Sequence, residues 1–130
     1  MTAPSKILRA LVYARDSGRC ASCGTSEAKT FQHRAATGMG GAGRKAAPLN
    51  AADGLTLCGL CNEGAEHAGQ SRALALGWKL LRHRQLLACQ IPFYVQWAGE
   101  WWLPDVVGGK TVIHEALALE LIEAAGGNRD

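Results

Sequence analysis

Two cysteine pairs constrain this chain more than any other feature of its sequence. The first pair is Cys20-Ala-Ser-Cys23, the second is Cys58-Gly-Leu-Cys61, and 34 residues separate them. Each pair makes a tight turn that directs both sulfurs toward one point, and this spacing is typical of a tetrahedral four-thiolate zinc site. We therefore expect the four cysteines to bind one structural Zn²⁺ and to join two distant segments of the chain.

The start of the chain and its hydropathy bear on whether these cysteines form disulfides instead. The first ten residues, MTAPSKILRA, lack the long apolar core of a secretory signal, and no apolar stretch is long enough to span a bilayer. These features predict a cytoplasmic protein with no membrane partner, where zinc is favoured over disulfides. Cys89 has no histidine or asparagine arranged around it as in a nucleophilic site, so we expect a buried or half-buried thiol.

Residues with catalytic chemistry lie between and just after the two pairs. The segment FQHRAATGMGG contains His33, Asn50 follows it, and the second pair continues into Asn62, Glu66 and His67. A histidine, whose ordinary pKa is about 6.5, can accept a proton from water at cellular pH. A histidine, an asparagine and a polar helix start held by one zinc knuckle are the arrangement of a small nuclease site.

Three segments give this arrangement a family resemblance. RDSGRCASCG, QHRAATGMGG and NAADGLTLCGLCN resemble the HNH endonucleases of actinobacterial phages, well over residues 12 to 82 and more loosely to about residue 108. The resemblance implies an α+β fold with a small ββα-metal (HNH) core, a four-cysteine zinc knuckle, and a C-terminal β-hairpin and helix. It implies one domain over residues 1–130, with the core at about 12–82 and the C-terminal part at about 83–127, and a phage protein in the host bacterial cytoplasm.

The resemblance also implies catalytic roles for three residues. The family's general base for phosphodiester hydrolysis is the histidine that ends the first strand, a position similar to His33 here. Asn50 matches the motif's asparagine, which would hold His33 at the right angle. Asn62 matches the motif's last position, where family members usually place a metal-binding histidine.

The ligands of the catalytic ion, Mg²⁺ or Mn²⁺, are implied in the same way. Gln32 and Asn62 match the family's ligand positions. Glu66 lies one helical turn after Asn62 on the same face, and His67 is the weaker candidate because it is turned about 100° around the helix. Gln32 replaces the usual acidic ligand and Asn62 the usual histidine. Both amides are neutral, weaker donors, which leaves Glu66 as the one anionic ligand.

These departures leave competing functions open. The first is a divalent-metal-dependent DNA endonuclease, and the second is a catalytically decayed HNH scaffold that binds DNA or a protein. A purely structural zinc module is the third. An intact His33 beside Gln32 and Asn62 does not decide among them.

The distribution of charge indicates where DNA would bind. Residues 1–45 hold eight Lys and Arg against two acids, whereas residues 88–130 hold two against six. DNA would therefore meet the N-terminal part, and the C-terminal part is available to a phage or host protein. Arg34, Arg44 and Lys45, in or beside the glycine-rich segment, are candidate phosphate contacts, although a solvated loop would carry the same charges.

Apolar periodicity and turn residues predict the regular elements. We expect a packing helix over 6–16 capped by Ser5 rather than a helix that reads DNA. Asn62 and Gly77 should begin and end a central helix. Three of the four tryptophans fall in a predicted hairpin and should form the core of a small sheet. The remaining expected elements are strands at 29–34, 54–58 and 78–82, a loop at 35–53, hairpin strands at 92–97 and 101–104, and a helix at 112–125 capped by Thr111.

Overall fold

The computed structural model describes residues 3–35 and 48–126. Within them lie four α-helices, two short 3₁₀ helices and two small antiparallel sheets, so the predicted α+β class is confirmed. No helix in these residues is both long and apolar enough to cross a bilayer. The elements are α1 (Lys6–Arg15), β1 (Lys29–His33), η1 (Ala51–Asp53), β2 (Gly54–Cys58), α2 (Gly59–Glu66), α3 (Gln70–Ala75), η2 (Ala88–Gln90), β3 (Phe93–Val95), β4 (Glu100–Pro104), β5 (Lys110–Ile113) and α4 (Glu115–Ala124).

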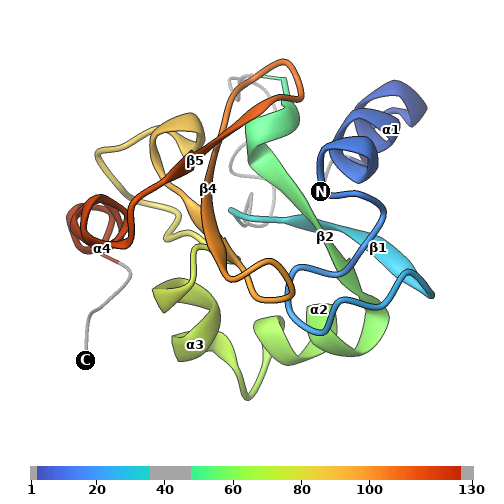
Figure 1. The fold of residues 1–130 in the computed structure, drawn as a ribbon, viewed down its shortest axis with the longest axis horizontal. Helices are drawn as coiled ribbons and strands as arrows, with labels where there is room; N and C mark the ends of the chain where they lie inside the picture. The colour runs from blue at the N-terminus through green and yellow to red at the C-terminus, as the bar shows by residue number, and fades with distance from the viewer. Residues whose placement is uncertain (1–2, 36–47, 127–130) are drawn as a thin grey trace.

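The first helix and the first sheet follow the sequence prediction closely. The Ser5 side chain caps α1 by accepting a hydrogen bond from the Leu8 N–H at 3.1 Å. Strands β1 and β2 pair from Lys29 opposite Cys58 to His33 opposite Gly54. Gly54 has no room for a Cβ, because the Phe31 ring lies against it. All of β2 is buried rather than half-buried as predicted, since it lies between α1 and the second sheet (Figure 1).

The predicted central helix is two helices, and it begins earlier than Asn62. Cys58 is the N-cap of α2, so the second cysteine pair itself forms the first helical turn. At His67 the backbone leaves the helix, with φ −124° and ψ −107°. The Gly69 N–H donates to the Gly64 carbonyl at 2.7 Å, an approach that leaves little room for a Cβ on Gly69. The turn between α2 and α3 therefore depends on Gly69, which the apolar pattern did not reveal.

The strand predicted at 78–82 does not form. After Gly77, which adopts φ +74°, the N–H groups of Trp78 and Lys79 donate back to the Ala73 carbonyl at 2.9 and 3.2 Å. These bonds cap the end of α3 and take the donors that a sheet would have used. Only Leu80 makes a strand-like contact, an isolated bridge to Ala35.

The predicted hairpin is confirmed and extended by a strand. Strands β3, β4 and β5 form a three-stranded sheet in that order, with Trp101 opposite Ile113. The last helix therefore starts at Glu115 rather than 112, and His114 rather than Thr111 caps it. The β-branched run at residues 111–113 favours a strand over the helix that its apolar spacing suggested.

One apolar core joins the two sheets. Leu55 and Leu57 of β2 pack in a cluster with Phe93 and Trp102 of the second sheet. Trp101 is also buried, so the tryptophans of the hairpin act mainly as core residues, as predicted. The segments expected at 12–82 and 83–127 thus share one interior.

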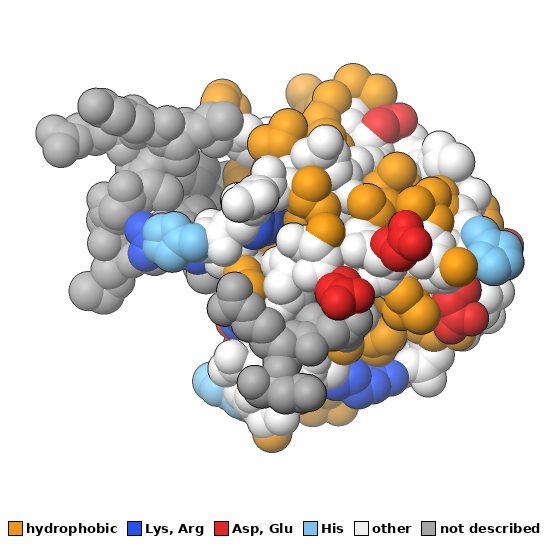
Figure 2. Space-filling view, turned by 90° about the vertical axis from the view of Figure 1, so that its left-hand side faces the viewer, with side chains coloured by type: hydrophobic (Ala, Val, Ile, Leu, Met, Phe, Trp, Pro, Cys, Tyr) orange, Lys and Arg blue, Asp and Glu red, His pale blue; other side chains and the backbone are white. Residues whose placement is uncertain are grey.

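The surface over α4 lies on the side of the molecule opposite α1 (Figure 1). Figure 2 shows apolar side chains interspersed with acidic ones on this side. On α4 itself Leu117 and Leu119 are exposed, and Ala118 and Ile122 face the core. The three glutamates of α4, Glu115, Glu120 and Glu123, are exposed on this side, away from α1.

Candidate functional site

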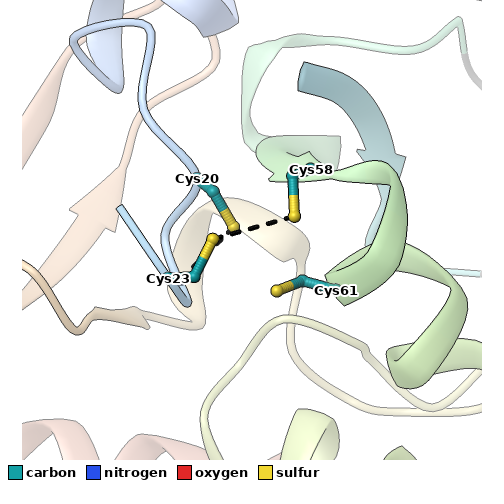
Figure 3. Close-up of side chains that lie close together, drawn as sticks. All are labelled: Cys20, Cys23, Cys58 and Cys61. Carbon is teal, nitrogen blue, oxygen red and sulfur yellow. Dashed lines mark hydrogen bonds between the residues drawn. The ribbon is translucent and has the colours of Figure 1, made fainter. Parts of the chain in front are cut away.

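The four paired cysteines converge on one point (Figure 3). Their sulfur atoms all lie within 4.8 Å of one another, and Cys23 Sγ and Cys58 Sγ are 3.7 Å apart. Zn–S bonds of about 2.3 Å in a tetrahedron place neighbouring sulfurs about 3.8 Å apart. The cysteines are free thiols, not disulfides. The cluster is therefore spaced to hold a metal ion such as zinc, as the sequence predicted.

Local backbone structure fixes both halves of the cluster. In the first pair, the Gly24 N–H donates to the Cys20 carbonyl at 2.8 Å, and Gly24 adopts φ +80° to close the turn. The Cys23 N–H points at Cys20 Sγ, 3.4 Å away. In the second pair, Cys58 ends β2 and Cys61 lies in the first turn of α2. Hydrogen-bonded backbone therefore fixes the position of each of the four sulfurs.

The electrostatics of the cluster call for a cation. Burial is the main cause that raises the pKa of Cys61 to about 12, and the neighbouring thiols of Cys58 and Cys20 add to it. Four sulfurs this close cannot all ionise unless positive charge lies between them. Metal binding would therefore release protons and be coupled to pH.

Strand β1 divides the predicted catalytic residues between two faces. Successive side chains of a strand point in opposite directions, so Thr30 and Gln32 face α2 whereas Phe31 and His33 face α1. The Phe31 and His33 rings are 5.1 Å apart, edge to face. His33 is half-buried and lines a pocket between α1 and β1. The general-base candidate therefore does not share a face with its proposed metal ligands.

On the α2 face, Gln32 and Glu66 meet as predicted, but with a third partner. The buried Gln32 amide donates to Glu66 Oε1 at 3.3 Å, and Lys79 Nζ lies 2.7 Å from Glu66 Oε2. Burial alone would raise the pKa of Glu66, but the hydrogen bond and charge of Lys79, with the Gln32 hydrogen bond, lower it. An ammonium group therefore already neutralises the one anionic ligand candidate.

The other proposed ligands of a catalytic ion are Asn62 and His67. Asn62 Nδ2 donates to Thr30 Oγ1 at 2.8 Å, and His67 is exposed at the end of α2. Among the described residues, the four cysteines are the sole group of three or more His, Cys, Asp or Glu placed to share an ion. Gln32, Glu66 and Lys79 form a hydrogen-bonded set in which the Lys79 ammonium balances the charge of Glu66.

Asn50 caps the start of η1. Its Oδ1 accepts from the Ala52 N–H at 2.9 Å, and its own N–H donates to Asp53 Oδ2 at 2.8 Å. This capping box orders η1, whose Asp53 carbonyl accepts the Arg34 N–H at 2.9 Å. Asn50 thus supports the end of β1 through η1.

The three candidate phosphate contacts have different outcomes. Arg34 is wrong as a DNA contact, because its side chain is fully buried and donates to backbone carbonyls such as those of Gly77 and Ile91. Arg44 and Lys45 lie outside the described residues. Arg34 is thus the one member of the set that lies in the described residues, and it is buried.

Sequence reasoning missed residues that the structure places near the predicted ones. Lys79 lies in the segment predicted as a strand, and no local sequence pattern indicated its ion pair with Glu66. Arg9 and Tyr13 line the His33 pocket with Lys29. Their spacing of four residues on an expected helix was a usable signal, since it places both on one face.

Comparison with protein-family profiles, with curated proteins and with solved structures finds no match to this chain.

Proposed function

We propose that this chain is an HNH-like DNA endonuclease built on a ββα unit with a zinc knuckle at its base. The order β1, β2, α2, with α2 starting at the second cysteine pair, agrees with the unit that the sequence motifs imply. The observation that carries the proposal is the position of His33. It is the last residue of β1, half-buried beside a pocket on the α1 face.

His33 would act as the general base. A neutral imidazole at the rim of a pocket can take a proton from a water that attacks a phosphodiester bound there. The capping box at Asn50 fixes η1, and η1 is hydrogen-bonded to the residue that follows His33. This support would hold the ring at a constant angle, which general-base catalysis needs.

A decayed scaffold that binds DNA or a protein is the second candidate. The Glu66–Lys79 ion pair favours it, because Lys79 places a fixed positive charge where the family would bind Mg²⁺ or Mn²⁺. The exposed leucines of α4 offer a separate surface for a phage or host protein. The two candidates differ in whether His33 performs chemistry.

A plasmid-nicking assay across a titration of Mg²⁺ or Mn²⁺ tests the proposal. We expect His33→Ala to lower the nicking rate by at least about 10²-fold, the usual contribution of a general base. Zinc content and circular dichroism should match the wild type, because His33 is not a member of the cysteine cluster and lies at the end of β1 away from Lys29, the residue opposite Cys58. Absence of nicking by the wild type at every metal concentration would refute the nuclease and leave the binding scaffold.

The double variant Gln32→Glu, Asn62→His is the matched gain-of-function test. A second carboxylate beside Glu66 would compete for Lys79 and create an anionic pair suited to a divalent ion. We expect the variant to bind Mn²⁺ more tightly in isothermal titration. A lower metal requirement for nicking would further show that an ion on the α2 face assists the chemistry at His33. Unchanged Mn²⁺ binding would mean that the α2 face is not a metal site in this protein.

A further inference from the structure

A pocket of about 440 Å³ lies between α1 and β1. Arg9 and Tyr13 of α1 form one wall, and Lys29, Phe31 and His33 of β1 form the other. Its volume lies within the range of about 300–1,000 Å³ that is common for ligand pockets. It is separate from the cysteine cluster and opposite the Gln32–Glu66 face of β1.

The described lining of the pocket carries two cationic side chains. Arg9 and Lys29 are exposed, and neither forms a salt bridge within the described ranges 3–35 and 48–126. None of the described residues that line the pocket is acidic. Lys29 Nζ lies 5.8 Å from the centre of the Tyr13 ring, so one cation is held beside an aromatic surface.

The two walls are fixed relative to one another. At the end of α1, Arg15 Nη1 donates to the Ala51 carbonyl at 2.8 Å, and Asp16 accepts the Thr56 N–H at 2.7 Å. Below the pocket, Phe31 packs against Val12 in a buried cluster. The helix that we expected only to pack therefore also presents Arg9 and Tyr13 in a preorganised position.

We propose that this α1–β1 pocket binds a phosphodiester segment of a DNA strand. Arg9 and Lys29 contact phosphate oxygens from opposite walls, and Tyr13 packs against a sugar or base. The strand then passes His33, so the inference rests on the proposed function in taking DNA as the substrate. Cations lie on both walls, and Lys29 lies beside the Tyr13 ring. This arrangement suits a nucleic-acid strand better than an acidic peptide, because sugars and bases can pack against Tyr13 and carboxylates cannot.

Charge reversal with matched controls tests the pocket. Binding of a short labelled DNA duplex is measured by fluorescence anisotropy at low ionic strength, without added divalent metal. We expect Arg9→Glu and Lys29→Glu each to weaken binding by about tenfold or more, and to reduce the log–log salt slope by about 0.9. Lys6→Glu on the same helix and Arg82→Glu elsewhere change the net charge equally at exposed positions that do not line the pocket, and should weaken binding by less than about threefold.

Competition with inorganic phosphate at matched ionic strength distinguishes a DNA strand from a free anion. A strand that spans both walls should resist displacement, whereas loss of binding at low phosphate concentration would identify a phosphate site and overturn the DNA assignment. The proposal is also overturned if the pocket variants bind no worse than the controls, or if the wild type does not bind DNA. Nicking is measured separately. If the wild type binds DNA through the pocket but never nicks it, the nuclease proposal alone is refuted. If the wild type nicks DNA and the pocket variants bind DNA as well as the controls, the pocket proposal alone is refuted.

Discussion

The guanidinium of Arg34 donates hydrogen bonds to backbone carbonyls from segments that are far apart in the chain. Nε donates to Gly77 O at 2.9 Å, Nη1 to Ala52 O and Ala88 O at 3.0 Å, and Nη2 to Ile91 O at 2.7 Å. Burial lowers its pKa to about 9, with smaller effects from Arg15 and Arg84, so the group is still protonated at neutral pH. One charged side chain thus connects η1, the end of α3 and η2.

Replacing Arg34 by lysine should be strongly destabilising. An ammonium has three donors instead of five and cannot reach carbonyls in several directions, so a buried charge and buried acceptors lose partners. We expect Arg34→Lys to lower the free energy of unfolding by about 3 kcal/mol or more. Urea denaturation of the zinc-loaded protein measures this, with exposed Arg82→Lys expected to stay within about 0.5 kcal/mol of the wild type. Equal midpoints for the two variants would contradict a central role for Arg34.

Arg34 also shows why some site residues were predictable and others were not. The cysteine cluster was predicted because each pair forms a local turn and the spacing of the two pairs is typical of a four-thiolate metal site. The burial of Arg34 depends on carbonyls 18 to 58 residues away, and no local pattern encodes them. The sequence therefore predicted a phosphate contact at Arg34, because this cation lies next to a glycine-rich segment. The same limit hid the Glu66–Lys79 pair, whose partners are 13 residues apart.

Among the elements, local patterns located those whose ends are marked by cap or turn residues. Ser5 marked the start of α1, and the alternation in GLTLC marked β2 at its observed bounds. The predictions failed where tertiary contacts decide the ends: β5 exists because β4 pairs with it, and the break before α3 exists because Gly69 approaches Gly64. Apolar periodicity carries no information about either contact, although the β-branched run at residues 111–113 was a local sign of β5.

Two glycines in this region should respond to alanine in opposite directions. Gly64 lies within α2 with nothing near the position of a Cβ, so Gly64→Ala should stabilise the protein by about 0.5–1 kcal/mol through helix propensity. Gly77 adopts φ +74°, and a Cβ there would overlap the Pro92 carbonyl. We expect Gly77→Ala to destabilise by about 2 kcal/mol or more. Thermal unfolding followed by circular dichroism measures both, and a shift of the same sign would refute the assigned geometry.

At the scale of the whole molecule, the core and the cysteine cluster are continuous. Cys20 and Cys58 are buried in the same cluster as Leu55, Phe93 and Trp102. The cysteines join the turn after α1 to the β2–α2 junction, and the second sheet packs onto that junction. A metal ion bound there would stabilise contacts in both sheets rather than one loop.

Removal of zinc should therefore unfold the whole protein. Structural zinc sites contribute on the order of 10 kcal/mol to folding. The free energy of unfolding of a whole domain is about 5–15 kcal/mol, so the two are comparable. We expect elemental analysis to find one zinc per chain. After chelation, near-ultraviolet circular dichroism should be lost and tryptophan emission should shift to the red, because Trp102 is buried in the same cluster as Cys20 and Cys58. Cys58→Ser should do the same, whereas Cys89→Ser, outside the cluster, should keep its zinc and its fold. A protein that stays folded after chelation would show that the apolar core alone is sufficient, and the cysteine cluster would then need a role other than folding.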